Sequence, residues 1–433
     1  MLQPISIRYS FRPIRKSLAT GQVADLFGLA DEQPEHAIAD NLSLDIRPGD
    51  LVLFTGPSGS GKSSLLRAAG KQLDAVDAMA LDLPDRPLVD ALPGSVQERL
   101  DLLAACGLSE ARLLLRTPSE LSDGQRYRFR IALALSSTAP FLMADEFAAY
   151  LDRTLAKVLA FNLRKLVTRT GKGILLATTH EDLTDDLQPD LWVRCLGEGR
   201  IEATRKAACG LAQGAKPQAA FRKGISFAND LWLSEGSKSD WPYFARWHYR
   251  SHHVACVKRV VLLWHDREPI GICVFTTPAA SLNLRSRYFG LTGARTRLAL
   301  QALNRQLWLL SRVVLHPTYR GAGIGASFVR RACETCAVDW IETLSAMGHA
   351  NPFFEKAGFK RVGVIRKTDE HHKVRYGGMY GKRGMRVSAE TERKSRHSEP
   401  VYYVLDNRGR QSVADGTCVG KKGMRTFSGL SVE

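Results

Sequence analysis

The sequence predicts a protein of two domains, an α/β domain with a parallel sheet followed by a mixed α+β domain. The main observation is that in each half an apolar run leads into a glycine-rich loop and then into a helix-forming stretch. These two successions lie at residues 51–66 and 310–329. The length of 433 residues supports the division, because one ordinary domain takes about 150 residues.

The first domain, which we expect to span residues 1–202, alternates short apolar runs with helix-forming stretches. The alternation at Leu42, Leu44 and Ile46 predicts an antiparallel strand that leads into the strand at 51–54. Residues 96–115 are mostly helix-forming, with an interruption at Gly107, and a further helix follows the motif at 121–125. Two apolar runs, 141–144 and 174–178, predict buried strands of the same sheet.

The loop after the strand at 51–54 has the pattern G-x-x-x-x-G-K-S. Its glycines allow backbone N–H groups to face a polyphosphate at a helix N-terminus, where aligned peptide dipoles favour anions. Lys62 suits the β- and γ-phosphates, and the Ser63 hydroxyl suits Mg²⁺. We therefore expect a nucleotide site formed by Gly56, Pro57, Ser58, Gly59, Ser60, Gly61, Lys62, Ser63 and Ser64.

The two later strands end in side chains that have a use beside a bound nucleotide. Asp145 follows the strand at 141–144 and can complete the Mg²⁺ shell with Ser63. Glu146 can orient or deprotonate an attacking water, and His180 can reach the γ-phosphate. These residues predict hydrolysis of the nucleotide.

In this order the motifs resemble those of the ATP-binding-cassette (ABC) ATPases. The resemblance covers a Walker A loop at 56–63, an LSGGQ-like signature at 121–125, a Walker B strand at 141–146, a D-loop at 150–152 and the H-loop at His180. It implies ATP and Mg²⁺ as ligands. It also implies a head-to-tail dimer through this domain, most simply a homodimer, in which Ser122 and Gly124 of one copy contact ATP bound to the other.

The sequence departs from the ABC pattern between Lys62 and the signature. Only about 60 residues separate them, so the helical subdomain that grips a transporter's membrane partner is expected to be trimmed. Gln97 is the candidate for the glutamine that contacts Mg²⁺, or it is a surface helix residue. Phe27 is a candidate to stack on adenine, or it is a core residue. The arginines at 126, 128 and 130 do not share a helix face, which favours structural or solvated roles.

Residues 203–224 are small, basic and turn-forming, and we expect them to form a linker. A segment rich in aromatic residues, arginine and histidine follows at 240–253, and it includes His248, Tyr249, His252 and His253. Such a segment can stack on splayed bases, but at least half of its aromatic residues are expected to lie in the core. The runs 260–264 and 270–275 predict a β-hairpin.

The loop after the strand at 310–315 lacks the lysine of a Walker loop, so its backbone amides suit a pyrophosphate without a metal. The run Arg320-x-x-Gly323-x-Gly325 resembles the acyl-coenzyme-A (acyl-CoA) loop of the GNAT acetyltransferases. Residues 351–359, beginning at Asn351, resemble the closing helix and turn of that superfamily. The resemblance implies a domain at 225–380 that binds acetyl-CoA or another acyl-CoA. The residues implied are Val313, Val314 and Leu315 for the pantetheine arm, Arg320, Gly321, Ala322, Gly323, Ile324 and Gly325 for the pyrophosphate, and Asn351.

One position departs from the GNAT pattern in a way that bears on the chemistry. The tyrosine that often protonates the leaving thiolate is Phe354 here, so another residue, or water, must supply that proton unless none is needed. The combination of the two domains resembles a family described as an ABC ATPase fused to an acetyltransferase. The phrase His248-Tyr249-Arg250-Ser251 is similar to phage Mom-type DNA-modification proteins.

The formal net charge of +17 is distributed unevenly. Residues 1–210 carry 25 Lys and Arg against 27 Asp and Glu, whereas residues 211–433 carry 36 against 17. We therefore expect a polyanionic partner, most simply nucleic acid, on the C-terminal half. The segment 381–433 predicts a basic tail, flexible in part, with one strand at 401–405.

No stretch has the length and apolar character of a membrane span or a secretory signal, so we expect a cytoplasmic protein. The eight cysteines are scattered, and Cys333 and Cys336 are expected to be ordinary helix thiols. The leading functional hypothesis is an ATP-hydrolysing, acyl-CoA-dependent transferase that modifies bases of DNA or RNA. Two alternatives stay open: an ABC ATPase coupled to a transporter, and a protein or small-molecule N-acetyltransferase with a regulatory cassette.

Overall fold

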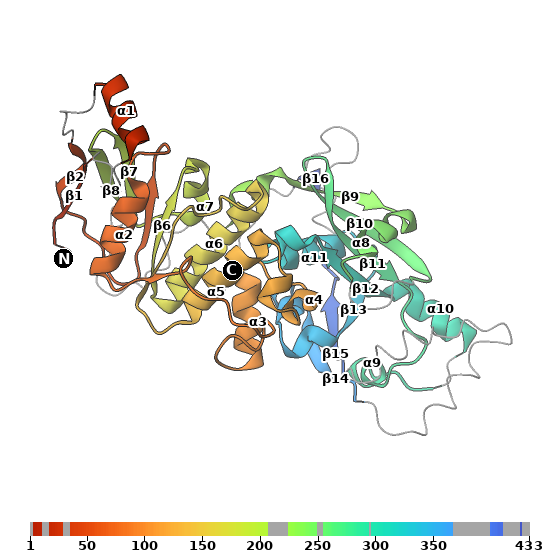
Figure 1. Cartoon of the computed structure of the whole chain (residues 1–433). Helices are drawn as coiled ribbons and strands as arrows, with labels where there is room; N and C mark the ends of the chain where they lie inside the picture. Colours follow the sequence, from red (N-terminus) through yellow and green to blue (C-terminus); the bar gives the residue numbers. More distant parts are fainter. Residues whose placement is uncertain are drawn as a thin grey trace, which may run out of the picture. The chain divides into compact units, whose positions relative to one another are not determined.

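The chain folds into two compact units, residues 1–225 and 226–433, which are described separately. The computed structural model in Figure 1 describes residues 3–10, 17–28, 35–206, 224–248, 254–293, 296–366, 399–409 and 425–426. Most of the expected linker lies outside these residues. Its first part does not behave as a linker, because residues 203–205 belong to a strand that pairs with its neighbour.

The first unit is built on a six-stranded sheet with the order β4-β5-β6-β3-β7-β8. Among its paired neighbours, only β7 and β8 run antiparallel. A separate antiparallel pair, β1 with β2, precedes the sheet in sequence. The strands are β1 Ile5–Ser10, β2 Glu35–Leu42, β3 Leu51–Thr55, β4 Val76–Asp77, β5 Phe141–Ala144, β6 Gly173–Thr178, β7 Leu191–Gly197 and β8 Arg200–Arg205.

Helices cover both faces of this sheet, which explains why its central strands are continuous apolar runs. One face packs against α2 and the β1–β2 pair, and the other packs against α3, α5 and α6 (Figure 1). Both faces of β3 are therefore buried. The helices of this unit are α1 Leu18–Leu26, α2 Lys62–Gln72, α3 Val96–Ala105, α4 Ala111–Leu114, α5 Asp123–Ser136, α6 Arg153–Thr170 and α7 Thr184–Leu187.

One sequence expectation for this unit needs correction and another is narrowed. The antiparallel strand expected around Leu44 and Ile46 ends earlier, at Leu42, although both side chains are buried. Their alternation reflects burial in a loop, not strand pairing. Of the two alternatives for Phe27, the core is excluded, because 75% of the residue is exposed just beyond α1; stacking on adenine stays a prediction.

The three arginines of α5 have the structural and surface roles that their spacing predicted. Arg128 is buried and donates to the carbonyl oxygens of Gly124 and Gly107, and Arg130 donates to the carbonyl oxygen of Met79. Arg126 forms an exposed ion pair with Asp123. None of them is held by a group of the nucleotide pocket described below.

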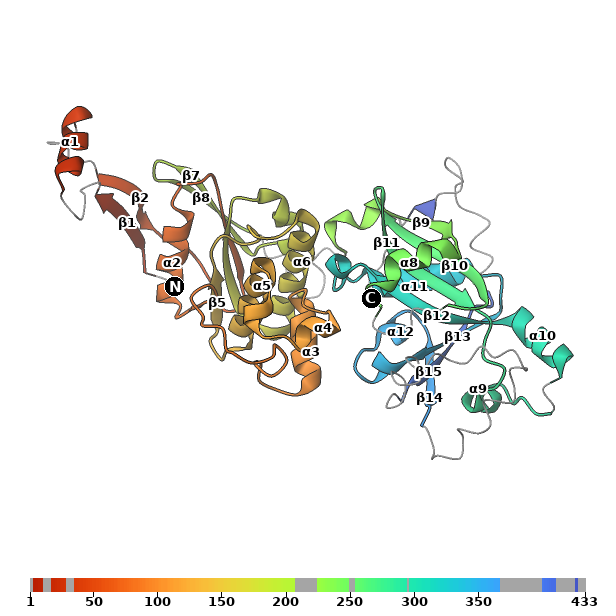
Figure 2. The ribbon, with the colours of Figure 1, turned by 45° about the vertical axis from the view of Figure 1, so that its right-hand side comes forward.

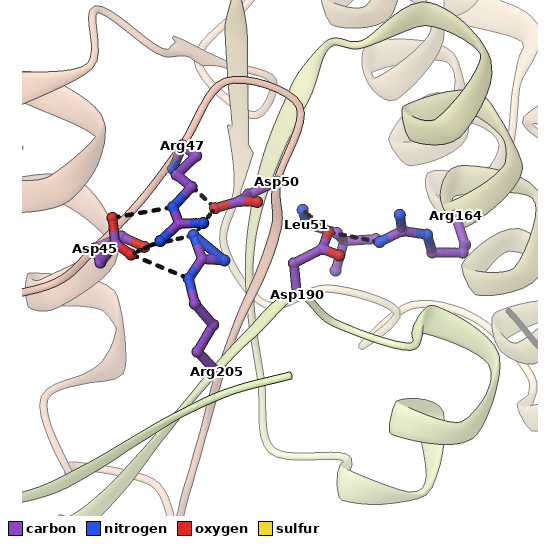
Figure 3. Close-up of polar contacts among 7 residues, drawn as sticks. All are labelled: Asp45, Arg47, Asp50, Leu51, Arg164, Asp190 and Arg205. Atoms are coloured by element: carbon purple, nitrogen blue, oxygen red, sulfur yellow. Dashed lines mark hydrogen bonds and ion pairs between the residues drawn. The ribbon is translucent and has the colours of Figure 1, made fainter. Parts of the chain in front are cut away.

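A polar network fixes the start of β3, the end of this strand that is far from the glycine loop (Figure 3). Asp190 accepts a hydrogen bond from the Leu51 amide at 2.8 Å and pairs with the buried Arg164 at 2.6 Å. On the other side of the strand, Arg205 pairs with Asp50 at 2.7 Å and with Asp45 at 3.2 Å, and Arg47 also pairs with Asp45. Burial raises the pKa of Asp50 despite this pairing. The network joins residues far apart in sequence and holds the register of β3.

The second unit is built on an eight-stranded sheet with the order β14-β15-β13-β12-β11-β10-β9-β16. The expected hairpin is present as the antiparallel pair β10 and β11. The strands are β9 Leu231–Gly236, β10 Val257–His265, β11 Glu268–Thr276, β12 Leu307–Leu315, β13 Trp340–Ser345, β14 Lys360–Val364, β15 Val401–Asp406 and β16 Arg425–Thr426.

Helices lie on both faces of this sheet as well (Figure 2). The helix α8 packs its Trp241 and Phe244 onto side chains of β10, β11 and β12. On the opposite face Phe328 of α11 lies against Gly271, where an added Cβ would come within 3.0 Å of the phenylalanine ring. The helices are α8 Trp241–Ala245, α9 Asn283–Tyr288, α10 Arg297–Gln306, α11 Ile324–Glu334 and α12 Phe353–Lys356.

The strand expected in the basic tail belongs to the body of the second unit. β15 is almost fully buried and pairs antiparallel with both β13 and β14. The boundary expected at residue 380 therefore cuts through this unit, and the fold extends at least to Asp406. Most of the remaining tail lies outside the described residues.

Both cysteines of the close pair are buried, at the end of α11 and just beyond it. Burial raises the pKa of the Cys336 thiol to about 12, and its Sγ lies 3.4 Å from the Ala332 carbonyl oxygen. Both features are typical of a structural thiol. Within the described ranges, no helix combines the length and apolar character that crossing a bilayer requires.

Candidate functional site

The first unit has a pocket of about 460 Å³ at the carboxyl ends of β3, β5 and β6. The glycine loop, the carboxylates after β5 and the histidine after β6 all contribute to its lining. The lining residues are Ile38, Ser58, Gly59, Gly61, Lys62, Ser63, Ser64, Asp145, Glu146, Phe147, Ala149, Ala177, Thr178, Thr179 and His180. The structure thus brings together the side chains that the sequence predicted to meet.

The glycine loop takes a backbone course that side chains would block. Gly56 has φ of 143°, and a Cβ there would lie 2.0 Å from the Cys195 carbonyl oxygen. Gly61 has φ of 90° and is the N-cap of α2, with no side chain capping the helix. The first amides of α2 are therefore available to an anion in the pocket. Ser60 Oγ is buried and has no hydrogen-bond partner within the described residues, which also fits a site that expects a polar ligand.

Lys62 is directed into the loop. Its ammonium group donates to the Pro57 carbonyl oxygen at 2.6 Å, and burial lowers its pKa. A lysine that is largely removed from water and donates to a neutral carbonyl gains much from an anionic ligand. This arrangement fits a polyphosphate.

Ser63 and Asp145 form the oxygen pair that a metal would need. Ser63 Oγ donates to Asp145 Oδ1 at 2.9 Å, and the Glu146 amide donates to the same oxygen at 3.0 Å. Hydroxyl and carboxylate oxygens suit Mg²⁺, which keeps several waters or phosphate oxygens as its other ligands. Arg67 approaches Asp145 at 3.4 Å from an exposed position.

Glu146 and His180 face the pocket from neighbouring strand ends. Glu146 is exposed and has a left-handed backbone, with φ of 49°, which turns the chain sharply after β5. The turn is held because the Phe147 amide donates to the Ala177 carbonyl oxygen at 2.7 Å. The His180 amide donates to Thr178 Oγ1 at 3.1 Å, which fixes the histidine backbone beyond β6. Glu146 is thus placed to accept a proton from a water in the pocket.

Three other predicted residues of this unit do not line the pocket. Ser122 is exposed at the N-cap of α5, where its hydroxyl accepts from the Gln125 amide, and Gly124 lies in the first turn. Gln97 does not line the pocket: it lies on α3 and its amide donates to Asp101 at 3.0 Å. For Gln97 the surface alternative describes its environment, and the Mg²⁺ role is not supported by its position.

Sequence reasoning missed contributions from the β1–β2 pair. Ile38 of β2 lines the pocket, and an added Cβ at Gly61 would come within 2.3 Å of its side chain. The Tyr9 hydroxyl of β1 lies 2.9 Å from Ser64 Oγ. No motif marks either residue, and the sequence around Ile38 has no alternation that signals which way it faces.

In the second unit, β12 and β13 run parallel and then separate. Their pairing covers only Leu307 to Leu309, and the Thr343 hydroxyl closes the junction by donating to the Leu310 carbonyl oxygen at 2.9 Å. Beyond it, the described residues pair β12 only with β11. We call this opening the fork. The His316 amide donates to Ile270 of β11, so strand alternation turns the amides of Val313 and Leu315 toward the fork.

The predicted pyrophosphate loop follows at the end of β12. Gly321 and Gly323 have φ of 90° and 78°, and Gly323 is the N-cap of α11 without a capping side chain. Arg320 donates through Nε to the Leu315 carbonyl oxygen at 3.1 Å and lies 3.4 Å from the Trp247 carbonyl oxygen. Arg320 therefore shapes the loop, whereas the amides at the start of α11 are the groups positioned for an anion.

The closing segment contains no acid at the position of Phe354. This ring is buried and packs against Phe353, Phe359 and Tyr403. The Tyr403 hydroxyl donates to Glu355 at 3.2 Å. Burial raises the pKa of the Tyr403 hydroxyl to about 12. Asn351 is exposed just before α12.

The aromatic segment divides between core and surface, as its composition predicted. Trp241 and Phe244 are buried, whereas Tyr243 is 43% exposed. The exposed Arg246 guanidinium lies 4.4 Å from the centre of the Tyr243 ring and 4.2 Å from that of the Trp247 ring, and these two rings contact each other. His248 lies against Trp241, and Tyr249, His252 and His253 fall outside the described residues.

Comparisons with known proteins found matches for each half of the chain. Residues 225–359 match the family model for the acetyltransferase (GNAT) family. The solved dimeric structure of the ATP-binding cassette MJ0796 bound to ADP and Pi aligns with 48% of this chain and 100% of its own, with 20% identity and a TM-score of 0.35.

The relatives of the first unit are ATP-binding proteins. The lipoprotein-releasing system ATP-binding protein LolD of Novosphingobium aromaticivorans is 32% identical over 202 residues, which cover 37% of this chain and 88% of the relative. LolD of Maricaulis maris is 33% identical over 194 residues, covering 35% and 83%. The chain therefore belongs to the ABC family of ATP-binding proteins. It is an enzyme that joins an ABC ATPase to a GNAT acetyltransferase domain.

Proposed function

We propose that the protein hydrolyses ATP in its first unit and transfers an acyl group from acyl-CoA to a base of DNA or RNA in its second unit. The assignment of a nucleic-acid acceptor rests on the charge of the C-terminal half. Residues 211–433 hold 36 Lys and Arg against 17 Asp and Glu, whereas residues 1–210 are nearly neutral. Excess positive charge on the half that bears the fork favours a polyanionic acceptor over a small neutral one.

ATP hydrolysis follows from the pocket of the first unit. The amides after Gly61 and the Lys62 ammonium would hold the phosphates, and Glu146 would take a proton from the attacking water. Ser63 and Asp145 would hold Mg²⁺, which neutralises developing charge on the phosphate oxygens. The exposed Ser122 and the partly buried Gly124 would complete the pocket of a second copy, so the proposal includes a homodimer through this unit.

Acyl transfer follows from the fork. The backbone of Val313 and Leu315 would pair with the pantetheine arm, and the amides after Gly323 would hold the pyrophosphate. A base amine would attack the thioester carbonyl, so that a C–N bond forms and the C–S bond breaks. The amine gives up one proton and the departing thiolate takes one up. Because Phe354 carries no proton, water is the proposed donor to the thiolate.

The acceptor would meet an aromatic surface on the second unit. The Arg246 guanidinium lies over the Tyr243 and Trp247 rings, and the exposed Arg246 and Tyr243 offer a surface on which a splayed base can stack. The likeness of residues 248–251 to Mom-type DNA-modification proteins is consistent with this role. ATP and acyl-CoA are cytoplasmic metabolites, and we place the reaction in the cytoplasm.

A transporter-coupled ATPase is the second candidate, because the relatives include ATP-binding proteins of a lipoprotein-releasing system. The short segment between Lys62 and the signature counts against it. Co-purification with an integral membrane protein would favour this candidate. A protein or small-molecule N-acetyltransferase is the third, and it predicts new acyl groups on proteins or metabolites instead of nucleosides.

The test is mass spectrometry of nucleosides and proteins from cells that express the intact chain or Glu146→Gln. We expect a nucleoside of increased mass with the intact chain and much less of it with the variant, because ATP hydrolysis is lost. The same nucleoside at full abundance in the variant would refute the role of ATP hydrolysis in transfer. If new acyl groups are found on proteins and not on nucleosides, the nucleic-acid acceptor is wrong and the third candidate, a protein N-acetyltransferase, is favoured.

A further inference from the structure

We propose that the insertion between β11 and β12, residues 277–306, is an arm that grips the phosphate backbone of a DNA duplex. This inference rests on the proposed function and assigns to one surface the contact with the acceptor. The insertion holds α9 and α10, and the strand that follows it forms one side of the fork. A contact here would hold the duplex beside the opening where the acyl group is presented.

The base of the arm is anchored rigidly. Arg285 of α9 is 2% exposed and binds both oxygens of Glu342 on β13, at 2.8 Å and 2.5 Å. The Tyr402 hydroxyl of β15 donates to the same carboxylate at 2.9 Å. Glu342 is paired with Leu309 at the last register position before the fork opens. The bidentate pair therefore ties the insertion to the junction of the two strands.

Aromatic contacts add to this anchor. The rings of Tyr288 and Phe289, at the end of α9, meet the Trp340 ring at the start of β13, with centroid distances of 6.5 Å and 5.0 Å. Such ring pairs stabilise an orientation as well as burying area. α9 is thus part of the body of the unit, which gives the rest of the insertion a fixed origin.

The outer part of the arm, α10, is exposed along its length. None of its ten residues is buried, and Figure 2 shows the helix extending beyond the end of the sheet. Thr296 caps its N-terminus by accepting from the Ala299 amide at 3.2 Å. Arg297, Gln301 and Arg305 are exposed and four residues apart, so they lie along one side of the helix over about 12 Å. An isolated short helix is marginal in water, and a partner along this side would explain its retention.

The charge of the whole region is of one sign. Residues 269–333 contain nine arginines, no lysine, no aspartate and no glutamate. Apart from the anchored Arg285, the described arginines of the insertion, Arg287, Arg297 and Arg305, are exposed. Guanidinium groups bind phosphate oxygens in a bidentate manner, and in a region without Asp or Glu no neighbouring carboxylate in the sequence competes with the phosphates for these arginines.

The apolar side chains of α10 are few on its exposed surface. Leu300 and Leu303 are partly buried, and Leu298 is the one large apolar side chain of α10 that is mostly exposed. This composition fits a phosphate backbone better than a membrane surface, which would require a broad apolar face.

The experiment compares two variants of the full chain that each lose two positive charges. The test variant is Arg297→Gln with Arg305→Gln. The control is Lys258→Gln with Arg267→Gln, two exposed residues of the same unit outside the insertion. Affinity for a blunt-ended DNA duplex is measured against salt concentration, together with acyl-CoA affinity.

We expect the test variant to bind the duplex about tenfold or more weakly at low salt, with a log–log salt slope smaller by about 2, and to keep its acyl-CoA affinity. The control should retain the affinity of the intact chain. Equal losses in test and control would overturn the arm, because binding would then follow net charge alone. Unchanged binding in the test variant would overturn it too, as would tight binding of phosphatidylserine vesicles through these arginines without duplex binding.

The outcome can be separated from that of the proposed function. If the intact chain still produces a modified nucleoside in cells while the test variant binds duplex normally, only the arm is refuted. If no modified nucleoside appears but the arginines are needed for duplex binding, the arm stands and base transfer is refuted.

Discussion

The two glycine loops of this chain have the same backbone plan and different side chains. Each follows a strand, each begins an eleven-residue helix, and each places a left-handed glycine at the N-cap, Gly61 with φ of 90° and Gly323 with φ of 78°. In neither case does a side chain cap the helix. The backbone alone therefore offers the same group to both ligands, a helix start with available amides.

The differences lie in what surrounds each loop. The first adds the Lys62 ammonium and the Ser63–Asp145 oxygen pair, which suit a metal-bound triphosphate. The second adds Arg320, which is bonded to main-chain oxygens of its own unit. The strands differ as well: β3 is paired on both sides, whereas beyond Leu309 the part of the chain that the structure describes pairs β12 on one side alone. A strand paired on both sides leaves only the loop for ligand contacts. A strand that is unpaired on one side also offers its own backbone amides, here to the pantetheine chain of acyl-CoA.

The largest expected effect is on the first loop, where a charge is removed. Lys62→Ala should lower the rate of ATP hydrolysis by about 10²–10³-fold, because it removes a preorganised cation from the phosphates. Acyl-CoA affinity should be unchanged. Steady-state ATPase assays and calorimetry with acyl-CoA measure the two sites in the same preparation.

A matched control for that variant is Lys172→Ala. Lys172 is also partly withdrawn from water with a pKa lowered by burial, and its ammonium donates to the Leu135 and Ser137 carbonyl oxygens outside the pocket. It should retain ATP hydrolysis. A comparable loss in both lysine variants would mean that destabilisation, not phosphate binding, explains the result.

A smaller effect is expected on the second loop, where only backbone geometry is at stake. Gly323→Val should weaken acyl-CoA binding by about 5–30-fold, because a left-handed backbone costs a side-chain-bearing residue about 1–2 kcal/mol and the loop would shift to avoid it. ATP hydrolysis should not change. The measurement is acyl-CoA titration by calorimetry.

Gly409→Val supplies the control for this variant. Gly409 has the same φ of 78° and open space around its Cα, in the same unit but outside the loop. It imposes a similar backbone penalty on folding without altering the helix start. If both glycine variants lose acyl-CoA affinity equally, the loop is not the site of the pyrophosphate.

The motifs of the first loop were predictable because they are local, and the remaining errors concern contacts between distant residues. Nothing in the sequence around Val401–Asp406 specifies that this strand inserts between β13 and β14, since its partners lie some 40 to 60 residues earlier. For Phe27 the sequence left stacking on adenine and burial in the core both open, and only the fold, in which the preceding helix has no buried residue, excludes the core. Leu44 and Ile46 show that apolar–polar alternation predicts which side chains are buried, but not whether the backbone forms hydrogen bonds with a neighbouring strand.

The second site was predicted less completely for a related reason. The sequence identifies a strand before Arg320, but the fork depends on where β12 stops pairing with β13. At that point the Thr343 hydroxyl donates to the Leu310 carbonyl oxygen and Glu342 is bound by the distant Arg285, and neither contact is local in sequence. The surroundings of Phe354 were not predictable either, because the Tyr403 ring beside it comes from β15.

The smallest expected effect tests the junction of the fork itself. Thr343→Val keeps the shape of the side chain but removes the hydrogen bond to the Leu310 carbonyl oxygen, leaving a buried acceptor without that donor. A bond of this kind contributes about 0.5–1.5 kcal/mol, so acyl-CoA affinity should fall by roughly 2–10-fold as the strand ends lose their fixed separation. Thr343→Ser, which retains the hydroxyl, should restore most of the affinity in the same titration. If the valine and serine variants bind acyl-CoA equally well, strand twist and not this hydroxyl sets the opening of the fork. The difference between the fully paired β3 and the partly unpaired β12 would then be a property of the sheet and not of one side chain.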